Sequence, residues 1–316
     1  MIVTLTVHPS LDRTISIDAP LRVGEVQTAT AVREDAGGKG INVARVLHAA
    51  TVESLAVLPL DAGDPFGAAL ADADVEVRTV PVHGRTRANI AVTDPTGETT
   101  KINLPGVALA VDDLRAIIEV VVEVSRGAAW LVLAGSLAPG LPDDSYVRVI
   151  RAVRTRLGDD APRIAVDTSG AALRAVVADG RPDLIKPNDE ELADLLGAAL
   201  PDAADLADAV HEAALALVPD TVGAALVTLG GDGAVLVSAD GAWAASPPPT
   251  RVRSTVGAGD SSLAGFLIAD SAGLDPATAL VSAIRYGSAA AALEGTQAPG
   301  TSDLPTADIP VRRLHR

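Results

Sequence analysis

Short apolar runs that end in turn residues recur along this chain of 316 residues, and they constrain its fold more than any other feature. They are rich in Ile, Leu, Val and Ala and lie at residues 2–7, 130–134, 163–166, 184–185, 225–229 and 234–237. Uninterrupted apolar runs of this kind are typical of strands buried on both faces. Stretches with helical spacing separate most of them, as at residues 41–50. The alternation predicts an α/β fold with a doubly wound, mainly parallel sheet and helices on both faces.

Two segments, at about 14–33 and 86–104, depart from this pattern because Thr, Ile, Val and Asn alternate there with polar residues. The second contains Pro95-Thr96-Gly97, which is typical of a hairpin turn. We expect half-exposed antiparallel strands that form a small β-lid over the sheet. Nothing in the sequence suggests a linker or a repeat, so we expect a single domain over 1–316 with these lid segments inserted.

The composition excludes several classes of protein. Lys and Arg number 25 against 41 Asp and Glu, and the resulting net charge of -16 repels nucleic acid and anionic lipid. The chain has no cysteine, so disulfides, thiolate zinc sites and cysteine nucleophiles are excluded. No apolar run reaches the roughly 20 residues of a membrane helix, and residues 1–12 do not resemble a signal peptide. We therefore expect a cytoplasmic protein that binds neither nucleic acid nor membrane.

Turn motifs follow four of the expected strands, namely Gly135-Ser136, Asp167-Thr168-Ser169, Lys186-Pro187-Asn188 and residues 228–233. Ligands of open α/β sheets bind beyond the carboxyl ends of the strands. Each motif alone is an ordinary turn, because Gly, Pro, Asn and Ser mark turns in any fold. Four together favour one shared cleft.

A Gly-rich loop at residues 36–40 runs directly into the helical stretch 41–50. Its glycines allow a close backbone approach, and a helix start presents free N–H groups to an anion. It is not a Walker A loop, since GxxxxGK[ST] is absent. Only three of the basic residues are lysine, and two of them, Lys39 and Lys186, lie in such motifs, whereas Lys101 does not. Either a compact ammonium is required there or the placement is chance.

Residues 255–260 precede an apolar stretch at 261–268 that is expected to be helical. The N–H groups of Gly257, Ala258 and Gly259 could form an anion hole at this helix start. Asp260 would stand beside it as an ionised carboxylate with an ordinary pKa of about 3.9. A base next to an anion hole suits phosphoryl transfer to an alcohol. The alternative is that Asp260 only stabilises the helix dipole.

Asn188 and Glu191 stand three residues apart at another expected helix start. This spacing is typical of a capping box. The functional alternative is that Glu191 holds Mg²⁺ on nucleotide phosphates, directly or through water.

Residues 37–44 (Gly-Gly-Lys-Gly-Ile-Asn-Val-Ala), 186–188 (Lys-Pro-Asn) and 256–260 (Val-Gly-Ala-Gly-Asp) together resemble the signatures of the ribokinase/PfkB sugar kinase family. Motifs at 8–12, 135–140 and 228–230 occur in the family's order, so the resemblance spans nearly the whole chain. The Gly-Lys-Gly-Ile-Asn loop, residues 86–89, and 102–103 with Gly106 are most similar to the fructose-1-phosphate and tagatose-6-phosphate kinase branch.

The resemblance implies a ribokinase-like fold, a homodimer formed through the lid, and a role for each motif. Asp260 would deprotonate the sugar hydroxyl while the amides of Gly257, Ala258 and Gly259 stabilise the transferring phosphoryl group. The sugar would be held by Asp12, Gly38, Lys39 and Asn42, and its existing phosphate by Arg87 and Ser136. ATP would be bound by Lys186, Asn188, Thr228, Gly230, Gly233 and Ser288, and Mg²⁺ by Glu191.

The implied reaction is ATP-dependent phosphorylation of a small-molecule ketohexose monophosphate. Fructose 1-phosphate is the favoured substrate, and tagatose 6-phosphate and fructose 6-phosphate are the alternatives. Residues 24–27 (Gly-Glu-Val-Gln) lack the basic residues that related fructose-6-phosphate kinases carry there, which disfavours the last. His8 replaces the branch's usual Asn and Ala138 its usual Pro, and the first change bears on sugar preference. A catalytically silent sensor on the same fold is the alternative from another class, disfavoured because Asp260 and Glu191 are both present.

Overall fold

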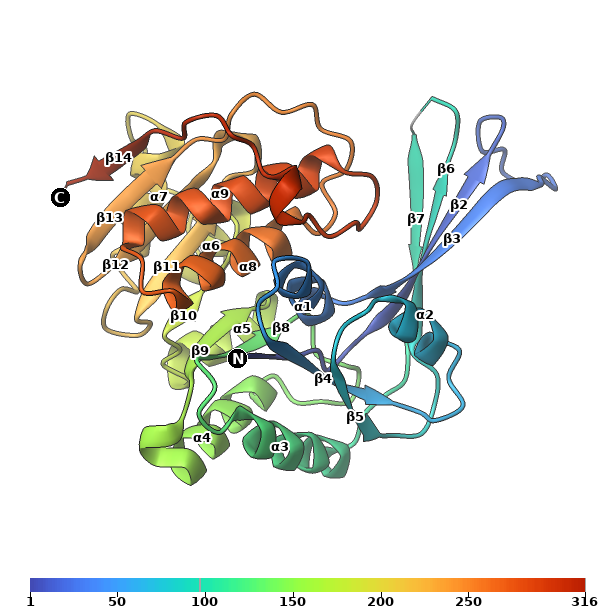
Figure 1. The fold of residues 1–316 in the computed structure, drawn as a ribbon, viewed down its shortest axis with the longest axis horizontal. Coiled ribbons are helices and arrows are strands. Elements are labelled where there is room, and N and C mark those ends of the chain that lie inside the picture. The colour runs from blue at the N-terminus through green and yellow to red at the C-terminus, as the bar shows by residue number, and fades with distance from the viewer. Residues whose placement is uncertain (97, 316) are drawn as a thin grey trace.

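The computed structural model of the chain describes residues 1–96 and 98–315 and is built around a ten-stranded sheet (Figure 1). In chain order its strands are β1 (Ile2–Leu5), β4 (Ser54–Leu60), β5 (Val77–Pro81), β8 (Trp130–Ala134), β9 (Arg163–Asp167), β10 (Leu184–Ile185), β11 (Ala224–Thr228), β12 (Ala234–Ser238), β13 (Gly241–Ala245) and β14 (Val311–Leu314). Their spatial order is β14-β13-β12-β11-β10-β9-β8-β1-β4-β5. Pairing is parallel from β5 to β11 and antiparallel from β11 to β14. The expected mainly parallel sheet is therefore confirmed.

Helices cover both faces of this sheet (Figure 1). They are α1 (Lys39–Ala49), α2 (Phe66–Asp72), α3 (Val111–Ser125), α4 (Ser145–Leu157), α5 (Gly170–Asp179), α6 (Asp189–Leu196), α7 (Leu206–Ala214), α8 (Ala258–Ser271) and α9 (Pro276–Ala292). Side chains of α3, α4, α5 and α7 pack in one buried cluster, and those of α1, α8 and α9 in another. The sheet separates the two clusters.

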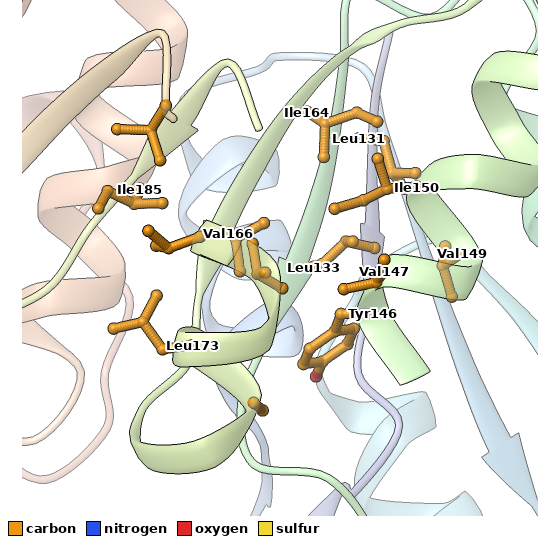
Figure 2. Packing of buried hydrophobic residues seen from close by; sticks show 14 of the residues in the cluster. Leu131, Leu133, Tyr146, Val147, Val149, Ile150, Ile164, Val166, Leu173 and Ile185 are labelled. Carbon is orange, nitrogen blue, oxygen red and sulfur yellow. The ribbon is translucent and has the colours of Figure 1, made fainter. Parts of the chain in front are cut away.

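Strand β8 shows why the strand sequences are uninterrupted apolar runs. Leu131 and Leu133 face the first cluster, where Figure 2 shows them beside Tyr146 and Ile150 of α4. The alternate residues Trp130, Val132 and Ala134 face the second cluster. Every side chain of the strand is buried, and burying a large apolar side chain fully contributes about 1.5–3 kcal/mol.

A second, four-stranded sheet projects from the body of the molecule (Figure 1). Its strands are β2 (Ser10–Ile17), β3 (Ala29–Gly37), β6 (Arg87–Thr93) and β7 (Thr99–Asn103), in the order β3-β2-β6-β7. The pairs β2–β3 and β6–β7 are antiparallel as expected, but β2 and β6 pair in parallel. The reason is that β2 follows β1 and β6 follows β5, and β1 and β5 run in the same direction in the main sheet. We call this second sheet the lid sheet.

The turn expected at Pro95-Thr96-Gly97 includes Gly97, which lies outside the described residues. Next to it, Asp94 Oδ1 accepts hydrogen bonds from the N–H groups of Thr96 and Glu98, at 2.8 and 3.1 Å. Across 1–96 and 98–315, no helix combines the length and apolar character needed to cross a membrane.

Candidate active site

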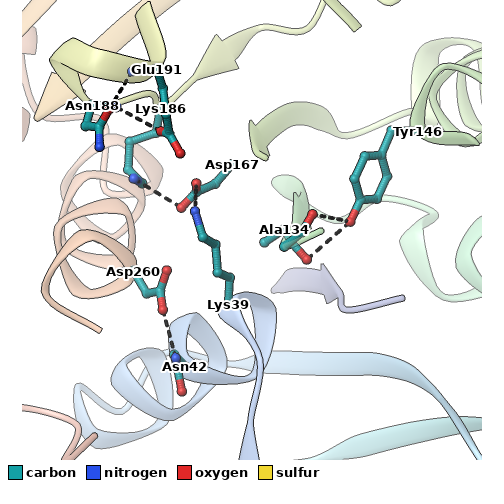
Figure 3. A network of polar contacts seen from close by, with 10 residues as sticks. Lys39, Asn42, Ala134, Tyr146, Asp167, Lys186, Asn188, Glu191 and Asp260 are labelled. Carbon is teal, nitrogen blue, oxygen red and sulfur yellow. Dashed lines mark hydrogen bonds and ion pairs between the residues drawn. The ribbon is translucent and has the colours of Figure 1, made fainter. Parts of the chain in front are cut away.

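A buried carboxylate bound by two lysines lies at the carboxyl edge of the main sheet. Asp167 ends β9 and has no exposed surface. Lys39 Nζ lies 2.7 Å from its Oδ1 and Lys186 Nζ lies 3.2 Å from its Oδ2 (Figure 3). Burial acts to raise the pKa of Asp167, but the two ammonium groups outweigh it and the pKa is lowered. From the sequence, Asp167 was identified only as part of a turn; the available signal was a carboxylate at the end of the short apolar stretch at residues 164–166.

Asp260 lies in the first turn of α8 and is almost fully buried. Asn42 of α1 donates its Nδ2 hydrogen bond to Asp260 Oδ2 at 2.8 Å (Figure 3). Burial, together with the nearby Asp167 carboxylate, raises the pKa of Asp260 to about 6, although Lys39, Asn42 and Lys186 oppose the rise. The ordinary pKa expected from the sequence is therefore wrong, because the side chain is removed from water. Above about pH 6 it is ionised and can accept a proton.

The start of α8 has the backbone that an anion site requires. The helix begins at Ala258, three residues earlier than the apolar pattern indicated, so Ala258 and Gly259 lie in its first turn. Gly257 precedes it with φ 77°, in the left-handed region that favours glycine. The Ala258 N–H makes only a long bond of 3.4 Å to the Thr255 carbonyl. N–H groups at a helix start attract negative charge.

In the lid sheet, Asp12 of β2 is held by two hydrogen bonds. Ser10 Oγ and Asn89 Nδ2 donate to its Oδ1 at 2.8 and 2.9 Å. Burial raises the pKa of Asp12 above its ordinary value. Gly38 joins the lid sheet to α1 with φ 129°, and a Cβ there would lie 2.7 Å from Thr6 Cγ2. From the sequence, Asn89 was recognised only as part of the motif at residues 86–89 and was assigned no role.

Arg87, at the start of β6, is half-buried, and its Nε has no hydrogen-bond partner among the described residues. Ser136 lies in the turn after β8, and its Oγ is 3.2 Å from His8 Nδ1. Tyr146 supports this turn, because its hydroxyl donates to the carbonyls of Ala134 and Gly135 at 3.3 and 3.0 Å (Figure 3).

The expected nucleotide residues extend along the same edge from Lys186. Asn188 and Thr228 form an isolated parallel bridge. Gly230 and Gly233 shape the turn after β11, where Leu229 N–H donates to the Gly233 carbonyl at 2.8 Å. Ser288 is buried in α9, and its neighbour Gly287 packs against Ser262 of α8. Within the described residues, no hydrogen bond links the 228–233 turn to Asp167 or Asp260.

The capping box at α6 is confirmed. Asn188 Oδ1 accepts from the Glu191 N–H at 2.6 Å, and Glu191 Oε2 accepts from the Asn188 N–H at 3.0 Å. Glu191 Oε1 stays outside the cap, and the carboxylate lies close enough to help raise the pKa of Lys39. Over the described ranges no cluster of three or more His, Asp or Glu could hold a metal. One carboxylate suits Mg²⁺, which binds proteins through one or two carboxylates together with substrate phosphates.

A hollow of about 520 Å³ touches the 228–233 turn through Leu229 and Asp232 but lies toward α7. Arg312 and Asp205, an ion pair of 2.7 Å, are among its walls. None of the residues around Asp167 and Asp260 lines it, so it is not the place where those groups meet a ligand.

Phosphoryl transfer to an alcohol needs a proton acceptor beside groups that stabilise phosphate charge. The first turn of α8 contains a buried carboxylate, Asp260, beside the N–H groups of a helix start. The fold is that of an α/β protein, and this arrangement is compatible with an enzyme that transfers phosphate. The family model described as pfkB family carbohydrate kinase matches residues 9–307, and the chain belongs to this family. It is an ATP-dependent carbohydrate kinase.

Its relatives narrow the acceptor to sugar phosphates. The chain is 36% identical to a 1-phosphofructokinase of Xanthomonas campestris pv. campestris, covering 91% of this chain and 88% of the relative. It is 34% identical to the ATP-dependent 6-phosphofructokinase isozyme 2 of Escherichia coli, covering 94% of each. The crystal structure of phosphofructokinase-2 from Escherichia coli in complex with potassium superposes with a TM-score of 0.86, at 32% identity over 96% of both chains. The chain is therefore a sugar-phosphate kinase.

Proposed function

We propose that this kinase transfers the γ-phosphoryl group of ATP to fructose 1-phosphate and so produces fructose 1,6-bisphosphate. The observation that carries the mechanism is Asp260, oriented by Asn42 at the start of α8. The similarity to the 1-phosphofructokinase supports the choice of sugar. So does the segment 24–27 (Gly-Glu-Val-Gln), which lacks the basic residues that related fructose-6-phosphate kinases carry there.

In the proposed step Asp260 accepts the proton of the sugar hydroxyl while the hydroxyl oxygen forms the new bond to the γ-phosphorus of ATP. The bond to the bridging oxygen breaks, ADP leaves, and Asp260 then releases its proton to solvent. The amides of Gly257, Ala258 and Gly259 stabilise the charge on the transferring group. Asn42 is a positioning residue, because it holds the carboxylate through a hydrogen bond.

The sugar lies between the lid sheet and α1, held by Asp12, Gly38, Lys39 and Asn42. Arg87 and Ser136 bind its existing phosphate. The partnerless Nε of Arg87 supports this assignment, since an Arg fork binds phosphate through paired hydrogen bonds. In a chain with net charge -16, an anionic substrate requires such a local positive group.

ATP lies along the edge formed by Lys186, Asn188, Thr228, Gly230, Gly233 and Ser288. Glu191 would hold Mg²⁺, which when bound neutralises phosphate charge. Since ATP and sugar phosphates are both metabolites of the cytoplasm, we place the protein there.

We treat the chain as one domain with the lid sheet inserted, and we propose that two copies associate through that sheet. Its strand register places Asp12 and Asn89 on one face and Ile15, Ile90 and Ile102 on the other. Ile102 is 52% exposed. A second copy would cover this apolar face while the polar face binds sugar. One solved relative is a tetrameric inhibited form of phosphofructokinase-2 from Escherichia coli.

A coupled assay of ADP release tests the reaction, with fructose 1-phosphate, fructose 6-phosphate and tagatose 6-phosphate as acceptors. We expect sugar-dependent ADP release that is fastest with fructose 1-phosphate. Binding of sugar phosphate and ATP without ADP release would instead favour a silent sensor.

A further inference from the structure

His8 occupies a position between two segments that border the proposed sugar-phosphate site. Its Nδ1 lies 3.2 Å from Ser136 Oγ, in the turn after β8. Its Nε2 lies 3.2 Å from the carbonyl oxygen of Pro105, in the segment after β7. Nothing in the proposed phosphoryl transfer uses this imidazole.

The Pro105 contact determines which ring nitrogen carries the hydrogen. A carbonyl oxygen only accepts hydrogen bonds, so Nε2 must be the protonated nitrogen. In a neutral imidazole Nδ1 is then bare and accepts, and the Ser136 hydroxyl has to donate to it. While His8 is neutral, Ser136 therefore presents lone pairs rather than a hydrogen to the proposed phosphate site.

We propose that His8 is a proton-coupled positioning residue that takes up a proton when the sugar phosphate binds and thereby turns the Ser136 hydroxyl toward that phosphate. The inference rests on the proposed function of this site. A proton from solvent adds to Nδ1, and Nδ1–H then donates to Ser136 Oγ. The hydroxyl hydrogen, released from His8, donates to a phosphate oxygen. Apart from this transfer of a proton from solvent to Nδ1, no covalent bond is made or broken.

The charges around His8 favour this change only when an anion is present. The titratable or charged groups on the segments packed near it are Asp12, Asp61, His83, Arg85 and Arg87. Asp61 is occupied by the N–H groups of Gly63 and Gly84, at 2.9 and 3.1 Å. Burial and the Arg87 guanidinium hold the pKa of His8 below its ordinary value, so both favour the neutral ring in the free protein. A dianionic phosphate beside Arg87 reverses the sign of the local field.

The sign of the pH dependence follows by linkage. If the pKa of His8 is higher in the complex than in the free protein, sugar-phosphate affinity increases as the pH falls through the interval between the two values. Each unit of difference corresponds to a tenfold change in affinity. ATP affinity should not follow this trend.

Isothermal titration of fructose 1-phosphate into the full chain, in two buffers of different ionisation enthalpy at pH 7, measures the proton uptake. We expect the wild type to take up a fraction of a proton more than His8→Asn, whose amide cannot titrate. His48→Asn, on the exposed side of α1 and 3.4 Å from Asp74, is the matched control and should behave as wild type. The phosphate's own ionisation, near pH 6, contributes equally to all three proteins.

Equal proton uptake by the wild type and His8→Asn would overturn the inference while leaving the proposed reaction intact. If none of the three ketohexose phosphates binds to the wild type, the proposed function fails and the inference fails with it. A second measurement needs no sugar. Nitrogen NMR of the free protein, with His8 assigned through His8→Asn, should show the Nε2–H tautomer, and the Nδ1–H tautomer would contradict the inference.

Discussion

Asn42 donates a 2.8 Å hydrogen bond to Asp260 across 218 residues of sequence, and this contact joins the starts of α1 and α8. The same two helix starts carry Lys39 and the Gly257–Gly259 amides, so one contact aligns the proposed sugar and phosphoryl positions. Because Asp260 is buried, its orientation and its pKa both depend on this bond and on the charges nearby.

Asp260→Asn keeps the size of the side chain and removes the proton acceptor. We expect kcat to fall by about 10²–10⁴-fold, the usual contribution of a general base, with little change in sugar or ATP binding. Steady-state kinetics and direct titration of both ligands measure this. Turnover near that of the wild type would mean that Asp260 is not the base.

The raised pKa of Asp260 predicts an acid limit to activity. The base must be ionised, so kcat/KM should decline as the pH falls through about 6, the value set by its burial. Asn42→Ala removes a hydrogen bond that lowers this pKa, so the decline should move to higher pH. Rate profiles between pH 5 and 8 compare the two proteins. If the decline in kcat/KM occurs at the same pH in Asn42→Ala as in the wild type, the acid limit does not come from Asp260.

The same burial predicts that folding stability decreases as the pH rises, whereas activity increases over the same interval. The folded pKa of about 6 lies above the unfolded value of about 3.9, so ionisation of Asp260 disfavours the folded state as pH rises through this interval. Asp260→Asn should therefore lose less stability than the wild type between pH 4 and 7. Denaturant titrations at both pH values would show it; identical pH dependence would contradict the raised pKa.

The two-lysine contact with Asp167 predicts that an arginine at position 39 cannot fully replace Lys39 in binding the sugar phosphate. Lys39→Arg keeps the charge but places a planar guanidinium where a compact ammonium lies 2.7 Å from a buried carboxylate. We expect KM for the sugar phosphate to rise by about tenfold, the equivalent of one lost charged hydrogen bond. Lys101→Arg, on an exposed strand of the lid sheet, is the matched control and should change little. If Lys39→Arg and Lys101→Arg change KM equally, nothing at position 39 requires a lysine rather than an arginine.

Arg87→Ala should weaken the use of fructose 1-phosphate far more than that of ATP. Loss of one charged contact to phosphate corresponds to about 1.5–3 kcal/mol, or roughly ten- to over a hundredfold in affinity. The two KM values, measured in the same series, check this. A comparable rise in both would show that Arg87 acts on the fold rather than on the sugar phosphate.

The part of the fold that was predictable is the part in which local sequence decides burial. The β8 run is apolar throughout, and β9 is apolar between Arg163 and Asp167, because both faces are covered there; the boundaries of both strands were predicted to within one residue. Four strands of the main sheet were missed, namely β4, β5, β13 and β14. Of these, β13 is a short Ala- and Gly-containing strand whose pairing is set by its neighbours. The parallel β2–β6 pairing was also missed, since it depends on where β1 and β5 end in the main sheet.

The site shows the same division. The Gly-rich loops and the Asn188–Glu191 cap follow from local spacing, and the structure contains that cap. The ion pairs of Asp167 bring together residues from three segments that are far apart in the sequence, so no local pattern predicts them. The pKa of Asp260 likewise depends on burial by the whole fold.

The position of the phosphate on the acceptor sugar is the central claim, and kcat/KM tests it most directly. Fructose 1-phosphate, fructose 6-phosphate and tagatose 6-phosphate should be compared side by side with saturating ATP. We expect the highest value for fructose 1-phosphate, by roughly tenfold or more, because Glu25 and Gln27 offer no positive charge to a 6-phosphate and one charged contact is worth about that factor. A preference for either 6-phosphate would contradict the assignment of fructose 1-phosphate.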